Sequence, residues 1–344
     1  MDTDKSEYMR DLRDYNLRTH NTFGIDVKCN RFLEYENVDE AREIARTLRE
    51  SATPFIIIGG GSNLLLTKDF NGIVVRSAVK GICKDGLRIT CGSGEVWDDV
   101  VAGSIACGLY GLENLSLIPG DVGASAVQNI GAYGTEAQDF IRDVYAVEIA
   151  TGKQRTFSRD ECRYGYRDSR FKHEWKNRYL IYAVEYELSN VFSPRLDYGN
   201  VRAELARKGL DENALTAQQV RDTIIEIRNA KLPDPKVTGN AGSFFMNPIV
   251  CREKYEQLAA QYADMPHYDT TDYDMVKIPA GWMIEQCGWK GKSLGRAGVH
   301  DKQALVLVNR GGATGAEIVA LCEAIRTDVK EKFQIDIYPE VNII

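Results

Sequence analysis

Glycine residues are concentrated in two segments whose backbone could hold a phosphorylated ligand. The first runs from Gly59 to Leu64 and follows the apolar run 55–58. Consecutive glycines can adopt positive φ and point successive N–H groups into one concavity, which suits a diphosphate. The spacing matches neither G-x-G-x-x-G nor G-x-x-x-x-G-K-S/T, so neither of these phosphate loops is predicted. By itself, this segment is explained slightly better as a tight turn.

The second segment, residues 119–134, changes that balance. It interleaves glycines with Gln128, Asn129 and Tyr133, so that backbone donors, side-chain amides and an aromatic ring occur together. Ligand sites typically combine an apolar surface with a few convergent polar groups. Two such segments in one half of the chain therefore predict a site for a large phosphorylated cofactor, against the alternative of two elaborate turns.

Three single residues outside these segments could act on a substrate. Arg167, followed by Asp168, can present a planar fork to a carboxylate, although such a charged run is more often a solvated loop. Ser243 has no G-x-S-x-G elbow, and only His300 stands in a comparable setting, so a hydrolase triad is poorly supported. Ser243 could equally cap a turn, and Glu340 is a lone carboxylate of a kind that is usually solvated.

Periodicity predicts the elements that position the two glycine segments. Apolar residues at helical spacing indicate helices over 38–48 and 97–105, the second ending near Gly108. The β-branched run 55–58 indicates a buried strand. The dipeptide Asn71-Gly72 predicts a turn that leads into a strand at 73–75.

Further along the chain, a hairpin is predicted over 144–157 and a strand over 179–188. Two capping boxes open helices: Thr216 with Gln219, and Thr314 with Glu317. The alternation of apolar and polar residues over 335–343 predicts a final strand.

Composition limits the class of protein. The chain has 344 residues and a net charge of −7, from 43 Lys+Arg against 50 Asp+Glu, which makes nucleic acid an unexpected partner. Without a long apolar run or a signal peptide, a cytoplasmic protein with no membrane partner is expected. Eight scattered cysteines and four histidines indicate buried thiols and no metal site. The length favours two domains, which we place at 15–190 and 200–344.

The chain resembles the UDP-N-acetylenolpyruvoylglucosamine reductase family over about residues 16–344. Five segments occur in the family's order, and two more resemble its longer, type I branch. The five are GGGSNLL (59–65), IPGDVGASAVQNIGAYG (118–134), YRDSRFK (166–172), GNAGSFFMNP (239–248) and PEV (339–341); the two are LDYGNV (196–201) and VHDKQALVLVN (299–309).

The resemblance implies an α+β fold and a bound cofactor. The fold is an FAD-binding domain of the vanillyl-alcohol-oxidase (PCMH) type in two subdomains, followed by a C-terminal α+β substrate-binding domain. Because neither glycine segment contains histidine, non-covalent FAD is expected, with NADPH as the reductant. The implied FAD contacts are Gly59, Gly60, Gly61, Ser62, Asn63, Leu64, Pro119, Gly120, Gly123, Gln128, Asn129, Gly131, Ala132 and Gly134. Which side chains of 124–126 reach FAD is left open.

The implied activity is the NADPH-dependent reduction of UDP-N-acetylglucosamine enolpyruvate to UDP-N-acetylmuramate in peptidoglycan synthesis, and hence in cell wall growth, cell shape and cell division. Hydride passes from flavin N5 to C3 of the substrate, and Ser243 protonates C2. Arg167 stabilises charge that spreads into the carboxylate, and Glu340 acts nearby, either protonated or through water. Tyr198, Lys231, Asn247 and Gln303 would contact the UDP portion.

Two other functions remain open from the residues alone. One is an FAD-dependent oxidase of the same superfamily that acts on a sugar or alcohol. The other is a non-catalytic sensor of a nucleotide sugar, against which the co-occurrence of Arg167, Ser243 and Glu340 argues. A monomer is expected.

Overall fold

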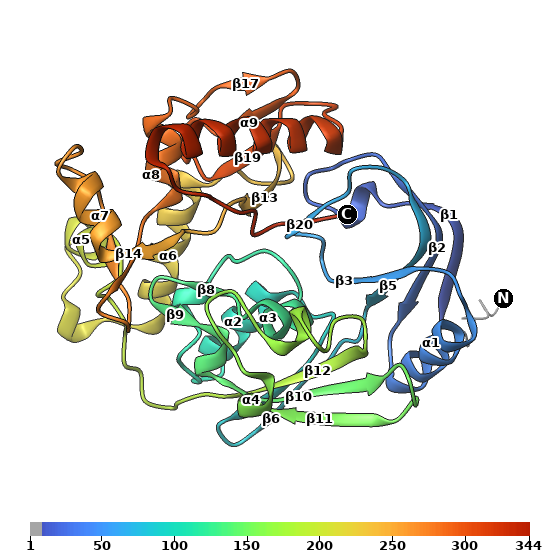
Figure 1. Cartoon of the computed structure of the whole chain (residues 1–344). Helices are drawn as coiled ribbons and strands as arrows, with labels where there is room; N and C mark the ends of the chain where they lie inside the picture. The colour runs from blue at the N-terminus through green and yellow to red at the C-terminus, as the bar shows by residue number, and fades with distance from the viewer. Residues whose placement is uncertain (1–8) are drawn as a thin grey trace. The chain divides into compact units, whose positions relative to one another are not determined.

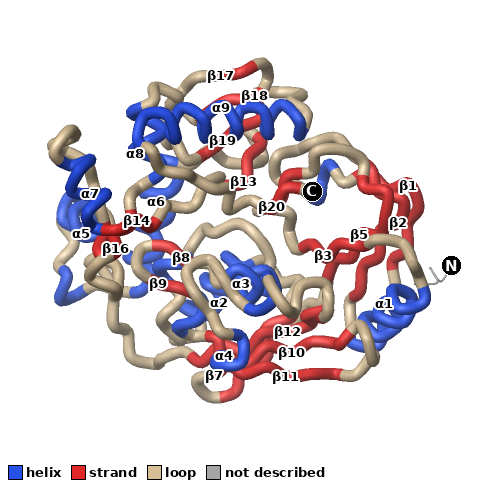
Figure 2. Tube along the Cα trace, in the orientation of Figure 1, coloured by secondary structure: helices blue, strands red, loops and turns tan. Residues whose placement is uncertain are grey.

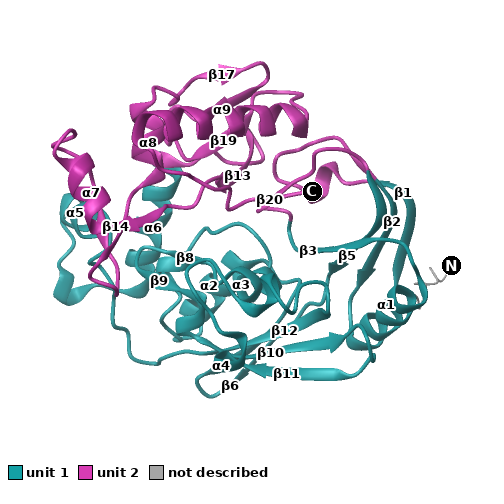
Figure 3. Cartoon of the chain, in the orientation of Figure 1, with its two compact units in different colours: residues 1–15, 29–60, 70–230 teal, residues 16–28, 61–69, 231–344 magenta. Residues whose placement is uncertain are grey.

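The computed structural model describes residues 9–344, which form two compact units (Figure 3). Unit 1 contains residues 9–15, 29–60 and 70–230 of the described chain, and unit 2 contains 16–28, 61–69 and 231–344. The domain boundaries expected from the sequence, 15–190 and 200–344, describe two continuous stretches of chain. Because the compact units are discontinuous in sequence, they do not test these boundaries, which stay a prediction. The first glycine segment passes from unit 1 to unit 2 between Gly60 and Gly61.

A four-stranded sheet forms one part of unit 1. Its order is β1 (Arg10–Asn16), β2 (Lys28–Tyr35), β5 (Phe70–Ser77), β3 (Phe55–Ile58), and β5 runs parallel to both β2 and β3. Helix α1 (Val38–Glu50) precedes β3, as the periodicity predicts. Asn37 caps it by accepting the Glu40 N–H, and α1 buries one apolar face. The helix and the strand are therefore confirmed, but the strand is not the buried one expected, because only Ile58 of β3 is buried.

The turn predicted at Asn71-Gly72 is wrong. Both residues lie within β5, which pairs in parallel with β3 and therefore cannot be joined to it by a hairpin turn. Glycine is needed here for a close approach instead: a Cβ on Gly72 would lie 2.3 Å from the Pro54 carbonyl oxygen. The same carbonyl accepts a hydrogen bond from the N–H of Ile73.

A five-stranded antiparallel sheet forms the second part of unit 1. Its order is β11 (Gln154–Ser158), β10 (Ile141–Glu148), β12 (Tyr179–Glu187), β7 (Arg88–Gly92), β6 (Ile82–Asp85). The predicted hairpin is β10 with β11, and the predicted strand is β12. Helices α2 (Trp97–Ala106) and α3 (Val122–Gln128) lie over one face of this sheet (Figures 1 and 2). Buried side chains from both helices and the sheet form one apolar cluster.

Unit 1 is completed by two further helices and small elements. Helix α5 is Val201–Arg207, and α6 is Ala217–Lys231, whose last residue falls in unit 2. The predicted capping box of α6 is present, since Thr216 N–H donates to Gln219 Oε1 and Gln219 N–H donates to Thr216 Oγ1. The small elements are β8 (Gly131–Ala132), β9 (Thr135–Glu136), α4 (Arg159–Cys162) and the 3₁₀ turns η2 (Glu113–Leu115), η3 (Ala137–Asp139), η4 (Arg170–Lys172) and η5 (Glu212–Ala214).

Helices α2 and α6 are joined by a partly buried ion pair. Arg221 Nη1 and Nη2 donate to Asp98 Oδ1 and Oδ2 at 2.6 and 2.9 Å. Burial works to raise the pKa of Asp98, but the Arg221 guanidinium and the Leu117 N–H outweigh it and hold that pKa below its ordinary value. A carboxylate with a lowered folded-state pKa stabilises the fold above its ordinary pKa and loses this contribution as pH falls through the folded-state pKa.

We therefore expect Asp98→Asn to lower the free energy of unfolding by about 3 kcal/mol near neutral pH, because it leaves a buried guanidinium without its countercharge. The deficit should be full above pH 3.8, the ordinary pKa, and should shrink below it as the wild-type carboxyl is protonated. Urea unfolding of both proteins at several pH values measures this. A deficit that stays constant into the acid range would contradict the electrostatic cause.

Unit 2 is built around another four-stranded sheet. Its order is β13 (Gly239–Ser243), β19 (Val306–Asn309), β18 (Ala297–Val299), β17 (Ser293–Leu294). Helix α9 (Gly315–Phe333) packs on β18 and β19 (Figure 1), and Thr314 with Glu317 forms its predicted capping box. The remaining elements are η1 (Arg18–His20), α7 (Arg252–Ala259), α8 (Ala280–Gln286), the sheet β14 (Ile249–Cys251), β16 (Met275–Lys277), β15 (Tyr268–Asp269), and the parallel pair β4 (Leu64–Leu65) and β20 (Asn342–Ile343).

The final strand predicted over 335–343 is largely wrong. Only Asn342 and Ile343 form a strand, β20. The alternation that suggested a strand is real as burial, because Ile335 and Ile337 are buried while Asp336 and Tyr338 are exposed. Before β20, this segment pairs with another strand-like stretch only at Pro339, which forms an isolated bridge with Phe245.

The cysteine prediction is correct only in part. The cysteines are free, as expected, and four are buried: Cys29, Cys91, Cys162 and Cys322. Cys83, Cys107 and Cys251 are exposed, so they are not buried thiols. Within residues 9–344, no helix is both long and apolar enough to cross a membrane, and no group of three or more acidic, histidine or cysteine side chains is arranged to hold a metal ion.

Candidate active site

The two glycine segments meet in unit 1. A Cβ on Gly60 would lie 3.0 Å from Asp121 Oδ1 and 3.3 Å from Gly120 Cα, and one on Gly59 would lie 3.3 Å from Ala124 Cβ. Side chains at these positions would push the segments apart. Two structurally independent turns would not need to approach each other this closely. Their contact therefore supports one backbone cradle formed by both glycine segments.

The second segment is a helix flanked by turns. Its middle part forms α3, and Asn129 ends the helix in the left-handed conformation with φ of 47°. Ser125 is fully buried and its Oγ lies 2.6 Å from the Tyr186 hydroxyl. Ala124, in contrast, contacts the first segment at Gly59. Of the side chains at 124–126, Ser125 and Ala126 therefore point into the core of unit 1.

Acidic charge beside the two segments is already compensated. Asp121 is the N-cap residue of α3 and its carboxylate occupies the space beside Gly60. Burial raises the pKa of this carboxyl, while Arg76 opposes this. Arg76 Nη1 donates to Glu34 Oε2 at 2.8 Å, and Nη2 donates to Asp121 Oδ2 at 3.3 Å. Arg76 thus offsets the negative charge of Asp121 and Glu34 beside the two segments.

Arg167 occupies a tight turn that is bonded to the second segment. Its φ is 56°, and the N–H groups of Gly165 and Asp168 each donate to the other residue's carbonyl oxygen, at 3.0 and 3.1 Å. Arg167 Nη2 donates to the Gly131 carbonyl at 2.6 Å. Asn129 Nδ2 donates to the Gly165 carbonyl at 2.8 Å. The unusual backbone conformation is thus held from several sides, which is common where a side chain must be placed accurately.

Arg228 is a residue that the sequence reasoning missed. It lies on α6 close to the Tyr133 hydroxyl, with which it interacts electrostatically, and has a buried Nε with no hydrogen-bond partner among residues 9–344. Burial lowers the pKa of Arg228, and the charge of Arg167 lowers it further. A buried guanidinium beside another cation is costly unless an anion is bound nearby. One feature of the sequence could have identified Arg228: it directly follows Ile227, which lies on the apolar, buried face of this helix.

Unit 2 brings Ser243 and Glu340 together. Ser243 ends β13, follows Gly242 with φ of 68°, and is exposed. The next residue, Phe244, is fully buried, and its carbonyl accepts the N–H of Glu340 at 2.8 Å. A buried phenylalanine therefore anchors the backbone beside both residues. Arg167 belongs to unit 1.

The four residues expected to contact the UDP portion are divided between the units. Tyr198 lies in unit 1 beside Gly134: a Cβ built on Gly134 would lie 3.1 Å from the Tyr198 Cβ. In unit 2, Asn247 Oδ1 accepts the N–H of Ala280 at the start of α8, at 2.9 Å. Gln303 Oε1 accepts the Leu305 N–H at 3.3 Å, and Lys231 is exposed at the end of α6. Asn247 and Gln303 thus use one polar atom each to hold local structure.

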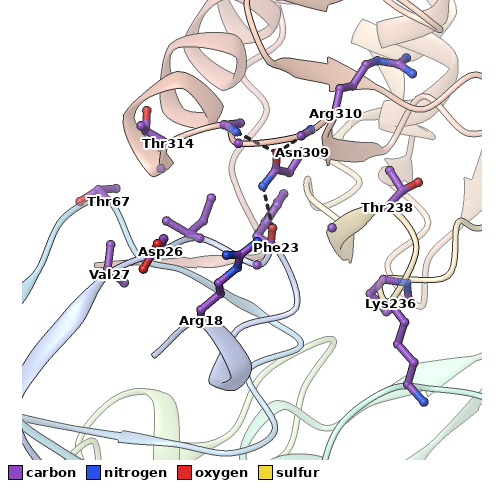
Figure 4. A pocket seen from close by; sticks show the side chains of 18 of the residues that line it. Arg18, Phe23, Asp26, Val27, Thr67, Lys236, Thr238, Asn309, Arg310 and Thr314 are labelled. Carbon is purple, nitrogen blue, oxygen red and sulfur yellow. Dashed lines mark hydrogen bonds between the residues drawn. The ribbon is translucent and has the colours of Figure 1, made fainter. Parts of the chain in front are cut away.

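An open pocket of about 960 Å³ lies elsewhere in unit 2 (Figure 4). Its lining includes Arg18, Thr238 and Asn309, whose Nδ2 donates to the Phe23 carbonyl at 2.9 Å. The Lys236 side chain extends away from the other labelled residues (Figure 4). None of the residues predicted for the site lines this pocket, which is therefore separate from the candidate active site.

Comparison with known proteins places both units in context. Residues 30–158 match an FAD binding domain, and residues 234–344 match the C-terminal domain of UDP-N-acetylenolpyruvoylglucosamine reductase. A reductase of that name from Bacteroides fragilis is 53% identical over 335 residues, which cover 96% of this chain and 99% of the relative. One from Burkholderia ambifaria is 44% identical over 334 residues, covering 96% and 95%.

A solved structure supports the fold. The reductase of Thermus caldophilus aligns with a TM-score of 0.69 at 21% identity, covering 98% of this chain and 99% of that one. The expected fold class, an FAD-binding domain with a C-terminal α+β domain, is confirmed. With relatives of this identity over nearly its whole length, the chain belongs to the UDP-N-acetylenolpyruvoylglucosamine reductase family.

Proposed function

We propose that this chain uses NADPH and FAD to reduce UDP-N-acetylglucosamine enolpyruvate to UDP-N-acetylmuramate, with Arg167, Ser243 and Glu340 as the residues that act on the substrate. Family membership makes the chain an FAD-dependent oxidoreductase of peptidoglycan synthesis. The observation that supports the residue assignment best is the Arg167 turn, which is hydrogen-bonded to the same segment, at Gly131, that is expected to contact the cofactor.

The residues of unit 1 fit FAD. A Cβ on Gly60 would collide with Asp121 and Gly120, so only glycine lets the backbones of the two segments approach this closely, as a shared diphosphate cradle would require. Arg228, with its enclosed Nε, offers positive charge beside Tyr133. When bound, FAD supplies two-electron transfer between NADPH and the substrate. The proposed contacts are the main chain and side chains of 59–64 and 119–134 named above.

The protein's own task is to make reduction of an enol ether possible. Such a double bond is electron-rich, and hydride addition at C3 leaves negative charge at C2 that spreads into the adjacent carboxylate. Arg167 would hold this carboxylate with its planar guanidinium, the kind of preorganised donor that stabilises developing charge. The left-handed backbone at Arg167 and its bond to Gly131 limit the positions that the guanidinium can take.

Ser243 would donate its hydroxyl proton to C2 and recover a proton from water afterwards. A serine hydroxyl is ordinarily too weak an acid at neutral pH, but a strongly basic carbon tolerates this mismatch when the geometry is good. Glu340, whose backbone is bonded to the residue after Ser243, would assist either as a protonated donor or through water. Lys231 would neutralise diphosphate charge, and Tyr198, Asn247 and Gln303 would bind the rest of the UDP portion.

An anaerobic half-reaction assay tests the proposal. NADPH should bleach the flavin of the purified holoenzyme, and one equivalent of UDP-N-acetylglucosamine enolpyruvate should restore its absorbance. Failure of the substrate to reoxidise the flavin would overturn the proposal. Rapid turnover with oxygen and a sugar or alcohol would then indicate an oxidase, whereas binding of the nucleotide sugar without turnover would indicate a sensor. A monomer in the cytoplasm stays a prediction.

A further inference from the structure

We propose that Asp98 is a positioning residue of the active site: one carboxylate that holds both the start of the second glycine segment and helix α6, which carries Arg228 to the end of that segment. The inference rests on the proposed function, because it takes residues 119–134 and Arg167 as the site. Asp98 is the second residue of α2 and lies outside every motif that the sequence singled out.

The first contact fixes the start of the segment. The N–H of Leu117 donates to Asp98 Oδ1 at 2.5 Å. Leu117 has φ of 57°, a left-handed conformation that costs a residue with a Cβ on the order of 1 kcal/mol. Only Ile118 separates it from Pro119, where the segment begins. A hydrogen bond to a charged carboxylate is the type that can hold such a conformation.

The second contact fixes α6. Arg221 forms the two-pronged pair with Asp98 described above, and its side chain is only 10% exposed. Arg221 and Arg228 are seven residues apart, which is about two turns of helix, so they lie on the same face of α6. Holding the helix at Arg221 therefore sets its rotation, and with it the direction in which Arg228 points.

The far end of the segment completes the arrangement. Arg228 lies beside Tyr133 and interacts electrostatically with its hydroxyl, one residue before Gly134. Tyr133 also has a left-handed backbone, with φ of 48°, and its carbonyl accepts Asn114 Nδ2 at 2.8 Å. Asp98 therefore holds the start of the segment directly, through the Leu117 N–H. It holds the region near the end indirectly, because it fixes Arg221 and thereby helix α6, which carries Arg228.

Charge gives Asp98 a second role in the same arrangement. Arg228 and Arg167 repel each other, whereas Asp98 attracts Arg228. The charged and titratable groups around Arg228 are Asp98 on α2, Tyr133 on the second glycine segment and Arg167 on its turn, with Arg221 bonded to Asp98. Neutralising Asp98 would therefore leave three guanidinium groups with less compensation beside the proposed flavin site.

A purely structural ion pair would also stabilise the fold, so the test needs a readout that stability alone does not move. We would prepare the holoenzyme of wild type, Asp98→Asn, Asp98→Glu, Arg221→Met and the double variant Asp98→Asn/Arg221→Met. The matched control is Asp222→Asn, which removes an exposed carboxylate one residue from Arg221. FAD affinity, the visible flavin spectrum, and kcat and KM for the substrate are measured at a temperature at which every variant is folded.

We expect Asp98→Asn and Arg221→Met each to weaken FAD binding at least tenfold and to shift the flavin spectrum, with kcat falling more than KM rises. The double variant should be no worse than the poorer single variant, because both remove one interaction. Asp98→Glu should recover part of the loss, and Asp222→Asn should behave as wild type.

FAD affinity, spectrum and kcat within twofold of wild type in folded Asp98→Asn would overturn the inference and leave only a structural ion pair. A fully additive double variant would also overturn it. Because FAD titration and the flavin spectrum need no substrate, they test Asp98 even if the wild-type protein fails to reduce the enolpyruvyl ether. The two failures are therefore distinguishable.

Discussion

With Ser243 replaced by alanine, we expect reduction of the flavin by NADPH at close to the wild-type rate and reoxidation by the enolpyruvyl substrate slowed about a thousandfold, within the range for losing a positioned general acid. The first half-reaction needs no proton at C2, whereas the second ends on it. Alanine should not disturb the fold, because Ser243 is exposed and its backbone is anchored by the buried Phe244.

Anaerobic stopped-flow measurement of flavin absorbance separates the two half-reactions. Wild type should show a slower second half-reaction in heavy water, and the variant should show a changed solvent isotope effect because water must replace the serine. The matched control is Ser293→Ala, an exposed serine on β17 at the opposite edge of the same sheet. Equal impairment of both half-reactions, or an unimpaired second one, would exclude Ser243 as the proton donor.

The second large effect is expected from Gly61→Ala, which should strongly destabilise unit 2. Gly61 has φ of 69°, and a Cβ there would lie 2.0 Å from the carbonyl oxygen of His20 and 2.9 Å from Asn21 Cα. Both obstacles are backbone atoms. Because the Gly61 carbonyl also accepts the Thr22 N–H at 3.1 Å, the segments around Gly61 and Thr22 cannot simply move apart. Left-handed strain and overpacking together should cost about 3 kcal/mol or more.

Urea and thermal unfolding of the purified variants measure this cost. Gly103→Ala is the matched control, since Gly103 lies within α2 and a Cβ there would meet nothing within 4 Å. It should raise the free energy of unfolding by about 0.5–1 kcal/mol, because alanine favours the helix more than glycine does. A Gly61→Ala protein that unfolds within 1 kcal/mol of wild type would refute the packing argument.

Local patterns in the sequence predicted the elements well where the pattern itself contains the physical cause. The capping boxes at Thr216 and Thr314 are contacts between residues three positions apart, and they form as predicted. Helix α1 follows from the spacing of its apolar residues, and strand β3 from its β-branched run. Gly72 was misread because the Pro54 carbonyl that crowds it belongs to another stretch of chain.

The final segment failed for a related reason. Alternating burial over 335–338 matches a strand, but a strand also needs a partner along its length, and here pairing before β20 is limited to the bridge at Pro339. Burial alternation can come from packing alone, whereas a ladder needs backbone hydrogen bonds that no single sequence displays.

The sequence by itself determined the chemical inventory: the two glycine segments, the residues Arg167, Ser243 and Glu340, and the family to which they point. Tertiary structure decided which groups face one another. It put Ser125 into the core, set Gly60 against Asp121, and joined Asp98 to Arg221 across 123 positions. The physical reason is range: propensity, capping and turn chemistry act over a few residues, whereas ion pairing and close packing depend on distances that only the folded chain defines.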